Sequence, residues 1–322
     1  MKRGAWLLLA ALLLGLTLAS LGFGELRLSP VDIWKGLTGQ DALVRTVLWN
    51  LRLPRTLVAI AVGAGLAASG TVMQALFRNP LASPDLLGVS SGGALGAVIA
   101  LSAGWGASSL FAVPVCALLG AFLAVALVLM LARQGAGTER LLLCGVALTA
   151  LLGAGTSFVI SFHSDGTHRA GLMVFWLMGG LEDRTWEHVW MAAPGIAAAC
   201  LLLLPLGRPM DLLALGEGGA QSLGVDVRRL RRKLIALATL LTALATAVAG
   251  LIGFVGLVVP HLLRLLAGPG HKRLLPLSML GGASFLLACD LLTRLAPGEI
   301  RVGVVSALIG GPFFLWLLRR RP

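Results

Sequence analysis

The apolar segments of this chain hold very few side chains that could carry chemistry. Asp290 lies near one end of a long apolar run, and His261 and Arg264 lie together in a shorter one. A proton- or sodium-coupled membrane transporter usually needs carboxylates or histidines in the middle of such segments. Asp290 stands four residues before Arg294, which favours a local ion pair. We expect Arg264 to extend toward an aqueous surface and His261 to pack rather than relay protons.

Other chemistries are equally poorly supported. The GxxxxGK(S/T) phosphate loop does not occur, so the chain cannot hydrolyse a nucleotide by that mechanism. His163 and His168 share one polar stretch and give the only hint of a clustered enzyme site or a haem contact. The cysteines stand singly in apolar runs without CxxC spacing, which indicates small buried side chains; they are Cys116, Cys144, Cys200 and Cys289. The sequence predicts a protein that is not an enzyme and holds no metal or cofactor.

The most distinctive polar stretch covers residues 207–233. Its centre is rich in glycine, and a basic run from Arg228 to Lys233 follows. Two short helices hinged at Gly216 or Gly218-Gly219 would suit docking into a groove of another protein. Their apolar stripe would consist of Leu213, Leu215, Ala220 and Leu223. The alternative is a loop on the membrane surface whose basic run binds anionic lipid, and the two interpretations are compatible.

Apolar helices must position these side chains. Of the 322 residues, 57% are hydrophobic and 12% are charged, and the mean hydropathy is +0.92. A soluble domain carries about twice that share of charge, so this composition excludes an ordinary cytosolic enzyme and a disordered chain. A helix needs roughly 20 apolar residues to cross a membrane, and the length leaves room for about ten crossings. We therefore predict an all-α polytopic membrane protein.

Ten spans follow from the apolar runs, and a retained first helix is favoured over a signal peptide because its run is long. The predicted spans are 5–23, 56–77, 86–103, 110–132, 141–162, 187–206, 234–250, 254–267, 275–293 and 302–318. Residues 24–55 are predicted to form an external loop. The apolar stretch 170–181 is too short to cross, so we expect a half-helix at the outer surface. It could gate an outer mouth, with Met173, Trp176 and Met178 facing either substrate or lipid.

The distribution of charge predicts the topology. The formal net charge is +12, and the basic residues lie in short loops between apolar runs rather than on a nucleic-acid-binding face. With ten spans, 17 Lys and Arg fall on the side of both termini and 9 on the other side. This bias predicts that both termini are cytoplasmic. The expected location is a bacterial inner membrane.

Long motifs occur in order along nearly the whole chain. They are Arg52-Leu53-Pro54-Arg55, the run Gly70–Val89, Leu213–Glu217 with Ala220 and Leu223-Gly224, Gly253–His261 with Arg264, and Ile309–Phe314. In these motifs the chain resembles the permease family of binding-protein-dependent ABC importers for iron chelates, haem and vitamin B12. The resemblance implies one permease domain over residues 1–322 with the type II ABC importer permease fold.

The resemblance also implies partners and site residues. The partners are a second permease subunit, identical or a paralogue, a cytoplasmic ABC ATPase dimer, and a periplasmic or lipid-anchored substrate-binding protein. Contact with the ATPase is implied for Leu215, Gly216, Glu217, Ala220, Leu223 and Gly224. Docking of the binding protein at an exposed rim is implied for Arg52, Arg55 and Arg294; anchoring to lipid phosphate is the alternative. The family has Leu-Pro after Glu299, where this chain has Ile300-Arg301.

The substrate is weakly encoded. Segment 78–85 together with 211–216 resembles ferric siderophore permeases, whereas Arg208-Pro209-Met210 resembles the vitamin B12 permease. We expect import of a ferric siderophore, with vitamin B12 (cobalamin) or haem as alternatives. A proton-coupled secondary transporter is a more distant alternative, because buried carboxylates are scarce.

Overall fold

The computed structural model describes residues 2–24, 26–132, 138–163, 168–296 and 300–319. Within these ranges the secondary structure is helical. Seven helices or continuous helical segments are long and apolar enough to cross a membrane, and three shorter apolar helices accompany them. The principal helices are α1 (Lys2–Gly22), α4 (Leu53–Leu76), α5 (Val89–Ser102), α7 (Ala112–Leu131), α8 (Thr138–Ser161), α10 (Trp186–Leu203), α13 (Val227–Ala249), α14 (Val255–Ala267), α15 (His271–Leu295) and α16 (Val302–Arg319). Each corresponds to one predicted span.

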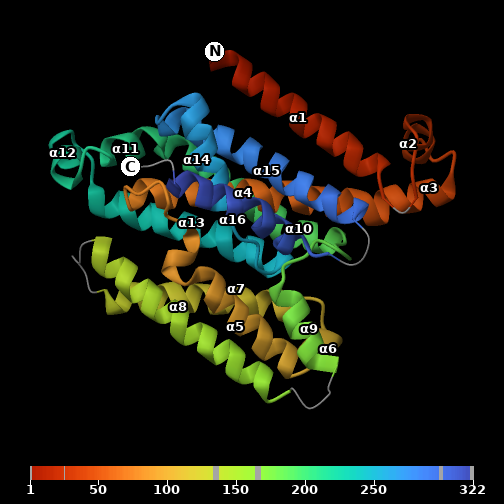
Figure 1. Ribbon diagram of the computed structural model, residues 1–322, viewed down its shortest axis with the longest axis horizontal. Coiled ribbons are helices and arrows are strands. Elements are labelled where there is room, and N and C mark those ends of the chain that lie inside the picture. The colour runs from red at the N-terminus through yellow and green to blue at the C-terminus, as the bar shows by residue number, and fades with distance from the viewer. Residues whose placement is uncertain (1, 25, 133–137, 164–167, 297–299, 320–322) are drawn as a thin grey trace.

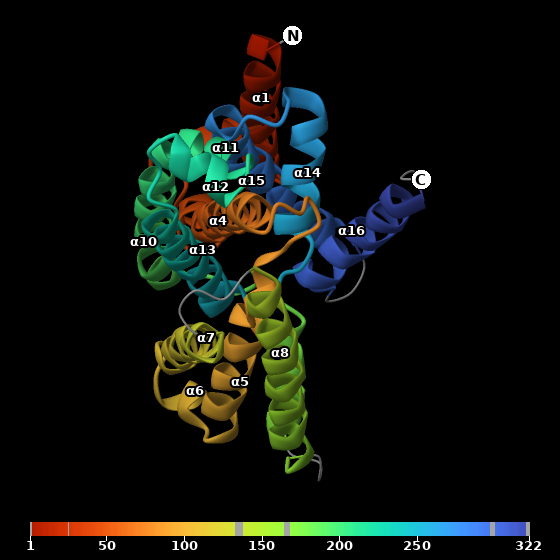
Figure 2. The ribbon, with the colours of Figure 1, turned by 90° about the vertical axis from the view of Figure 1, so that its left-hand side faces the viewer.

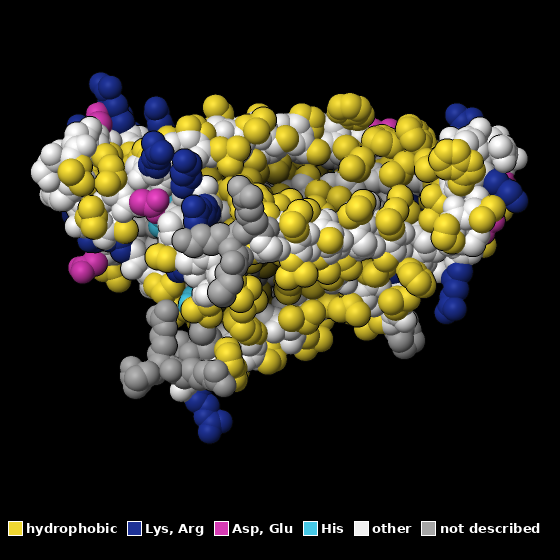
Figure 3. Space-filling view, turned by 90° about the horizontal axis from the view of Figure 1, so that it is seen from above, with side chains coloured by type: hydrophobic (Ala, Val, Ile, Leu, Met, Phe, Trp, Pro, Cys, Tyr) yellow, Lys and Arg dark blue, Asp and Glu magenta, His cyan; other side chains and the backbone are white. Residues whose placement is uncertain are grey.

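Short helices occupy the two ends of the molecule. One end carries α11 (Gly207–Leu213) and α12 (Glu217–Ser222), and the opposite end carries α2 (Pro30–Leu37), α3 (Ala42–Thr46), α6 (Trp105–Ser108) and α9 (His168–Leu177) (Figure 1). Between the ends, the face shown in Figure 3 is a belt of hydrophobic side chains, and Lys and Arg side chains gather at the ends. This is the distribution that a lipid bilayer requires.

The long helices form two layers that meet along α13. α1, α4, α10, α14 and α15 lie on one side, and α5, α7 and α8 lie on the other, with α16 projecting beside α14 (Figures 1 and 2). Two glycine contacts bring backbones close together. A Cβ at Gly70 would overlap the carbonyl oxygen of Gly256, and one at Gly63 would overlap that of Gly282. These contacts hold α4 against α14 and α15, as small residues do between helices in lipid.

The predicted loop 24–55 is largely helical. α2 begins with a capping box, in which Ser29 caps the backbone N–H of Asp32 and the Asp32 carboxylate accepts from the Ser29 backbone. From Ala42 the chain then runs through α3 and one π-helical segment (Val47–Arg52) straight into α4. The crossing helix therefore extends from residue 42 to residue 76. Pro54 sits at the start of α4, where a missing N–H is tolerated.

Candidate functional site

The two short helices at one end form a protruding elbow. Gly216 joins α11 to α12 with a φ of 98°, a conformation that favours glycine. The predicted apolar stripe divides into two parts. Leu213 and Ala220 are buried, whereas Leu215 and Leu223 are 65% and 59% exposed. The buried pair anchors the elbow to the body, and the exposed pair leaves two large apolar side chains on its surface.

An ion pair and a set of hydrogen bonds between a carboxylate and a histidine fasten the elbow to the spanning helices. Glu217 on α12 accepts from Arg231 on α13 at 2.5 Å. Asp211 on α11 accepts from both the backbone N–H and the Nδ1 of His271, each at 2.7 Å, at the start of α15. Gly207 also lies directly against the Lys272 backbone. These contacts connect α11 to α15 and α12 to α13. Glu217 thus pairs within the chain while its side chain stays 46% exposed, and its contact with an ATPase remains a prediction.

Gly224 closes the elbow. Its φ is 83°, its surroundings are open, and the next residue returns a backbone hydrogen bond to the Ala220 carbonyl at 3.0 Å. Asp226 then caps α13 by accepting from the Arg229 backbone at 2.9 Å. The six residues assigned to coupling thus lie within one compact unit, with Leu215, Glu217, Leu223 and Gly224 on its surface.

At the opposite end, arginines from different helices converge on one carboxylate. The Asp290 side chain is fully buried and accepts from Arg55 Nε at 2.8 Å and from Arg294 Nη2 at 2.5 Å. Arg294 also donates to the Ser20 carbonyl at 2.9 Å. The predicted pair between Asp290 and Arg294 is confirmed. The third member, Arg55, comes from α4 and was not predicted, because 235 residues separate it from Asp290.

The network continues to α9 and α16 through Glu182. This carboxylate lies in the segment between α9 and α10. It accepts from Arg301, just before α16, and lies 4.0 Å from Arg55 of α4. The Arg301 guanidinium also lies 3.2 Å from the centre of the Phe175 ring on α9. The departure from the family pattern at Ile300-Arg301 therefore adds a contact that holds the start of α16 against α9.

The expectation that the three arginines lie at an exposed rim is wrong in this structure. Arg52 is 6% exposed, and its guanidinium donates to the carbonyls of Leu21 and Leu26. The Arg294 side chain is 7% exposed, and only Arg55, at 19%, retains modest access to solvent. The physical reason is local. Arg52 satisfies carbonyls where α1 ends, and Asp290 would be an unpaired buried charge without Arg55 and Arg294.

The predicted half-helix is α9, and its end is fixed to two neighbours. Gly180 donates a backbone hydrogen bond to the Ala249 carbonyl at 2.9 Å, and Gly303 donates to the Gly179 carbonyl at 3.1 Å. Met173 is fully buried, so it faces neither substrate nor lipid, and this part of the gate prediction is wrong. Met178 is 43% exposed and Trp176 is partly buried.

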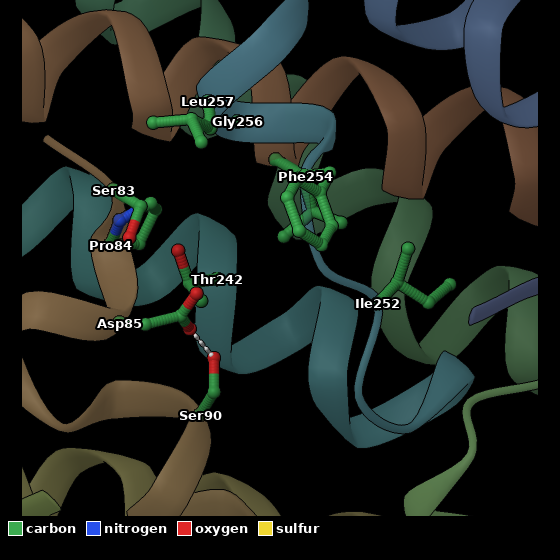
Figure 4. Close-up of a pocket in the computed structure, with 10 residues that line it drawn as sticks. Ser83, Pro84, Asp85, Ser90, Thr242, Ile252, Phe254, Gly256 and Leu257 are labelled. Carbon is green, nitrogen blue, oxygen red and sulfur yellow. Dashed lines mark hydrogen bonds between the residues drawn. The ribbon is translucent and has the colours of Figure 1, made fainter. Parts of the chain in front are cut away.

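A small cavity of about 20 Å³ lies where α4, α5, α13 and α14 meet (Figure 4). Asp85 points into this region, and its carboxylate accepts a hydrogen bond from Ser90. Phe254 flanks the cavity with a φ of 67°, which is rare for a residue with a side chain. Its ring packs against Gly310 of α16, where no larger residue would fit. This grouping was not predicted from the sequence, although Asp85, Phe254 and Gly310 all stand in the family motifs.

Arg264 and His261 belong to α14, the helix that contributes Gly256 and Leu257 to this cavity. Arg264 is half-buried and donates to Gln74 Oε1 on α4 at 2.9 Å, and its extension toward an aqueous surface remains a prediction. His261 is 3% exposed, consistent with the packing predicted for it. Among the described residues, no group of three or more His, Cys, Asp and Glu could hold a metal ion.

Comparison with known proteins places this arrangement in a family. The model of the FecCD transport family matches residues 12–320. The chain belongs to the FecCD transport family. It is 41% identical to the vitamin B12 import system permease protein BtuC of Klebsiella pneumoniae, over 98% of this chain and 93% of that protein. It is 43% identical to the hemin transport system permease protein HmuU of Yersinia pestis, over 97% and 94%.

A solved structure shows the same fold. A metal-chelate type ABC transporter in an inward-facing conformation superposes with a TM-score of 0.90 and 36% identity, covering 99% of this chain and 100% of that one. The family member described here therefore has the type II ABC importer permease fold and is a multi-pass membrane permease. The family and the fold that the sequence predicted are therefore confirmed.

Proposed function

We propose that this FecCD family chain forms half of the translocation path of a binding-protein-dependent importer, driven by a separate ATPase dimer that docks on α11 and α12. A second copy or a paralogue completes the path. The elbow is the observation that carries the proposal. It presents Leu215 and Leu223 to solvent while Asp211 and Glu217 fasten it to α15 and α13. A partner that closes beneath it would move the spanning helices together.

The path itself is proposed to run along the face between α8 and α16 (Figure 2). The small cavity lined by Asp85 and Phe254 lies next to both helices. α8 packs on the Leu86 backbone, beside Asp85, and α16 packs on Phe254. A second subunit that covered the exposed apolar residues of α8 and α16 would enclose this face. Those residues include Leu143, Leu151, Leu308 and Leu315.

The cargo is proposed to be a large metal chelate. The names of BtuC and HmuU favour a metal tetrapyrrole, vitamin B12 or haem, and the structural relative, a metal-chelate type transporter, favours a metal chelate in general. The ferric siderophore suggested by the loop motifs is the second candidate. All three are large ligands that contain a metal ion.

A binding protein is proposed to dock at the end that carries α2, α3 and α9. Arg55 is the member of the arginine set best placed to meet it, because its side chain keeps some exposure. A carboxylate of the partner would have to compete with Asp290 and Glu182 for the same guanidinium. Such a contact would set orientation and docking rate more than affinity.

The elbow is tested by its two exposed leucines. In proteoliposomes that contain the chain, its ATPase and its binding protein, Leu215→Ser and Leu223→Ser together should weaken ATPase docking and abolish ATP-driven uptake. Burial of a leucine contributes about 1.5–3 kcal/mol, so docking should weaken roughly tenfold or more. Ala214→Ser, at an exposed position in the same turn, is the matched control.

The same preparation separates the competing transport mechanisms and cargoes. Cobalamin, haem and a ferric siderophore are offered in turn, each with a binding protein that carries it. Uptake that needs ATP and ignores an uncoupler supports the proposal. Uptake that survives without the ATPase but collapses with an uncoupler would replace it with proton-coupled transport.

A further inference from the structure

A second and larger cavity lies at the end of the molecule opposite the elbow. Its volume is about 440 Å³, and its walls come from the ends of α5, α7, α9, α10 and α13 and from the segment around α6. α7 and α10 lie on one side of the molecule, and α8 and α16 lie on the other (Figure 2). The walls that α7 and α10 contribute therefore lie away from the face proposed for transport, on the side that we infer to face the bilayer.

Two arginines give this cavity a basic wall. Arg169 is exposed and donates to the Ser102 carbonyl at 3.0 Å, which fixes its guanidinium beside the cavity. Arg184 contacts His188 at 3.5 Å and the Gly180 carbonyl at 3.4 Å, and its buried Nε has no hydrogen-bond partner among the described residues. No carboxylate lines the cavity within the described part of the chain. The wall thus offers donors for an anion.

The remaining wall is mostly apolar, and we infer that it lies where the lipid tails of the membrane meet the head groups. Leu172 and Trp176 of α9 line the cavity together with Val113 of α7. Around α6, Trp105 and Phe111 are 50% and 51% exposed. Exposed Trp and other aromatic side chains at the end of spanning helices are typical of the boundary between lipid tails and head groups. One cavity therefore combines a basic wall with an apolar wall at head-group depth.

We propose that this cavity binds one anionic phospholipid of the outer leaflet, with its phosphate between Arg169 and Arg184 and the upper part of an acyl chain along Leu172 and Trp176. A free phosphate ion would use the arginines and leave the apolar wall uncovered. A zwitterionic lipid would bring a cationic group toward two guanidinium groups. A lipid in this position would also join α9 to α7 across the cavity. The assignment to the outer leaflet rests on the proposed function, in which α11 and α12 face the cytoplasm, but it does not depend on the transported substrate.

The test uses the purified full chain, with phosphatidylglycerol or phosphatidylcholine added and the bound lipid counted by native mass spectrometry. Phosphatidylglycerol should remain bound preferentially. Arg169→Gln with Arg184→Gln should reduce its retention roughly tenfold, the effect of losing charge-assisted hydrogen bonds. Arg45→Gln removes an exposed arginine of α3, away from the cavity, and should retain lipid as the unchanged protein does.

A second variant blocks the cavity without touching a charge. Ala107 lines the cavity and is exposed, so Ala107→Phe fills the space and should displace the lipid. Ala103→Phe makes the same change at an exposed position outside the lining and should not. Unchanged retention in both Ala107→Phe and the arginine double variant would overturn the proposal. Equal retention of phosphatidylcholine, or displacement of the lipid by inorganic phosphate, would overturn it as well.

Discussion

At the scale of single residues, the buried carboxylate of Asp290 organises one end of the molecule. Sequence spacing predicts its pairing with Arg294, since four residues along a helix bring two side chains together. The same reasoning cannot find Arg55, whose position depends on how α4 packs against α15. The family resemblance implies that the three arginines form an external docking set, and the structure shows them engaged within the chain.

Removing this carboxylate should destabilise the protein strongly. Asp290→Ala removes the carboxylate that the buried Arg294 and the partly exposed Arg55 share, and breaking a buried pair costs about 3–5 kcal/mol. Asp226→Ala removes a surface ion pair and a cap, and should cost only about 1 kcal/mol. The thermal midpoint in detergent, followed by fluorescence, measures both. A midpoint for Asp290→Ala equal to that of Asp226→Ala would show that the network is not structural.

At the scale of elements, the sequence predicts each crossing helix but not which helices touch. Apolar run lengths define the spans, and the structure moves their ends by a few residues. The larger difference lies in residues 42–52, which form a continuous helix into α4 although their charges suggest a loop. The helix contacts depend on particular glycines, and Gly70 and Gly153 look alike in the sequence. Gly70 faces the Gly256 backbone, whereas a Cβ at Gly153 would meet open space.

These two glycines give a paired prediction. Gly70→Ala places a methyl group against the Gly256 carbonyl and should separate α4 from α14, at a cost of about 1–3 kcal/mol or more. Gly153→Ala, in the middle of α8, should be neutral or stabilise by up to about 1 kcal/mol through helix propensity. Size-exclusion profiles after stepwise heating compare the two. Equal tolerance of both substitutions would contradict the close approach of α4 and α14.

At the scale of the whole molecule, the permease carries α11 and α12 at one end and α2, α3, α6 and α9 at the opposite end. Composition predicts the membrane class, and ordered motifs predict the family, because both are properties of the linear sequence. The division of the elbow into buried and exposed leucines, and the cavity between the two layers, depend on three-dimensional packing. Transport driven by a separate ATPase requires one orientation of the chain in the membrane. The end that carries α11 and α12 must face the cytoplasm, because an ATPase can act on the permease only from there.

The most direct test is cysteine accessibility in intact cells. In a chain whose four native cysteines are replaced, Leu223→Cys on the elbow and Leu43→Cys on α3 are both well exposed positions at opposite ends. A membrane-impermeant maleimide should label Leu43→Cys directly and Leu223→Cys only after the membrane is permeabilised. Labelling of Leu223→Cys in intact cells would place the elbow outside and contradict an ATPase-driven permease.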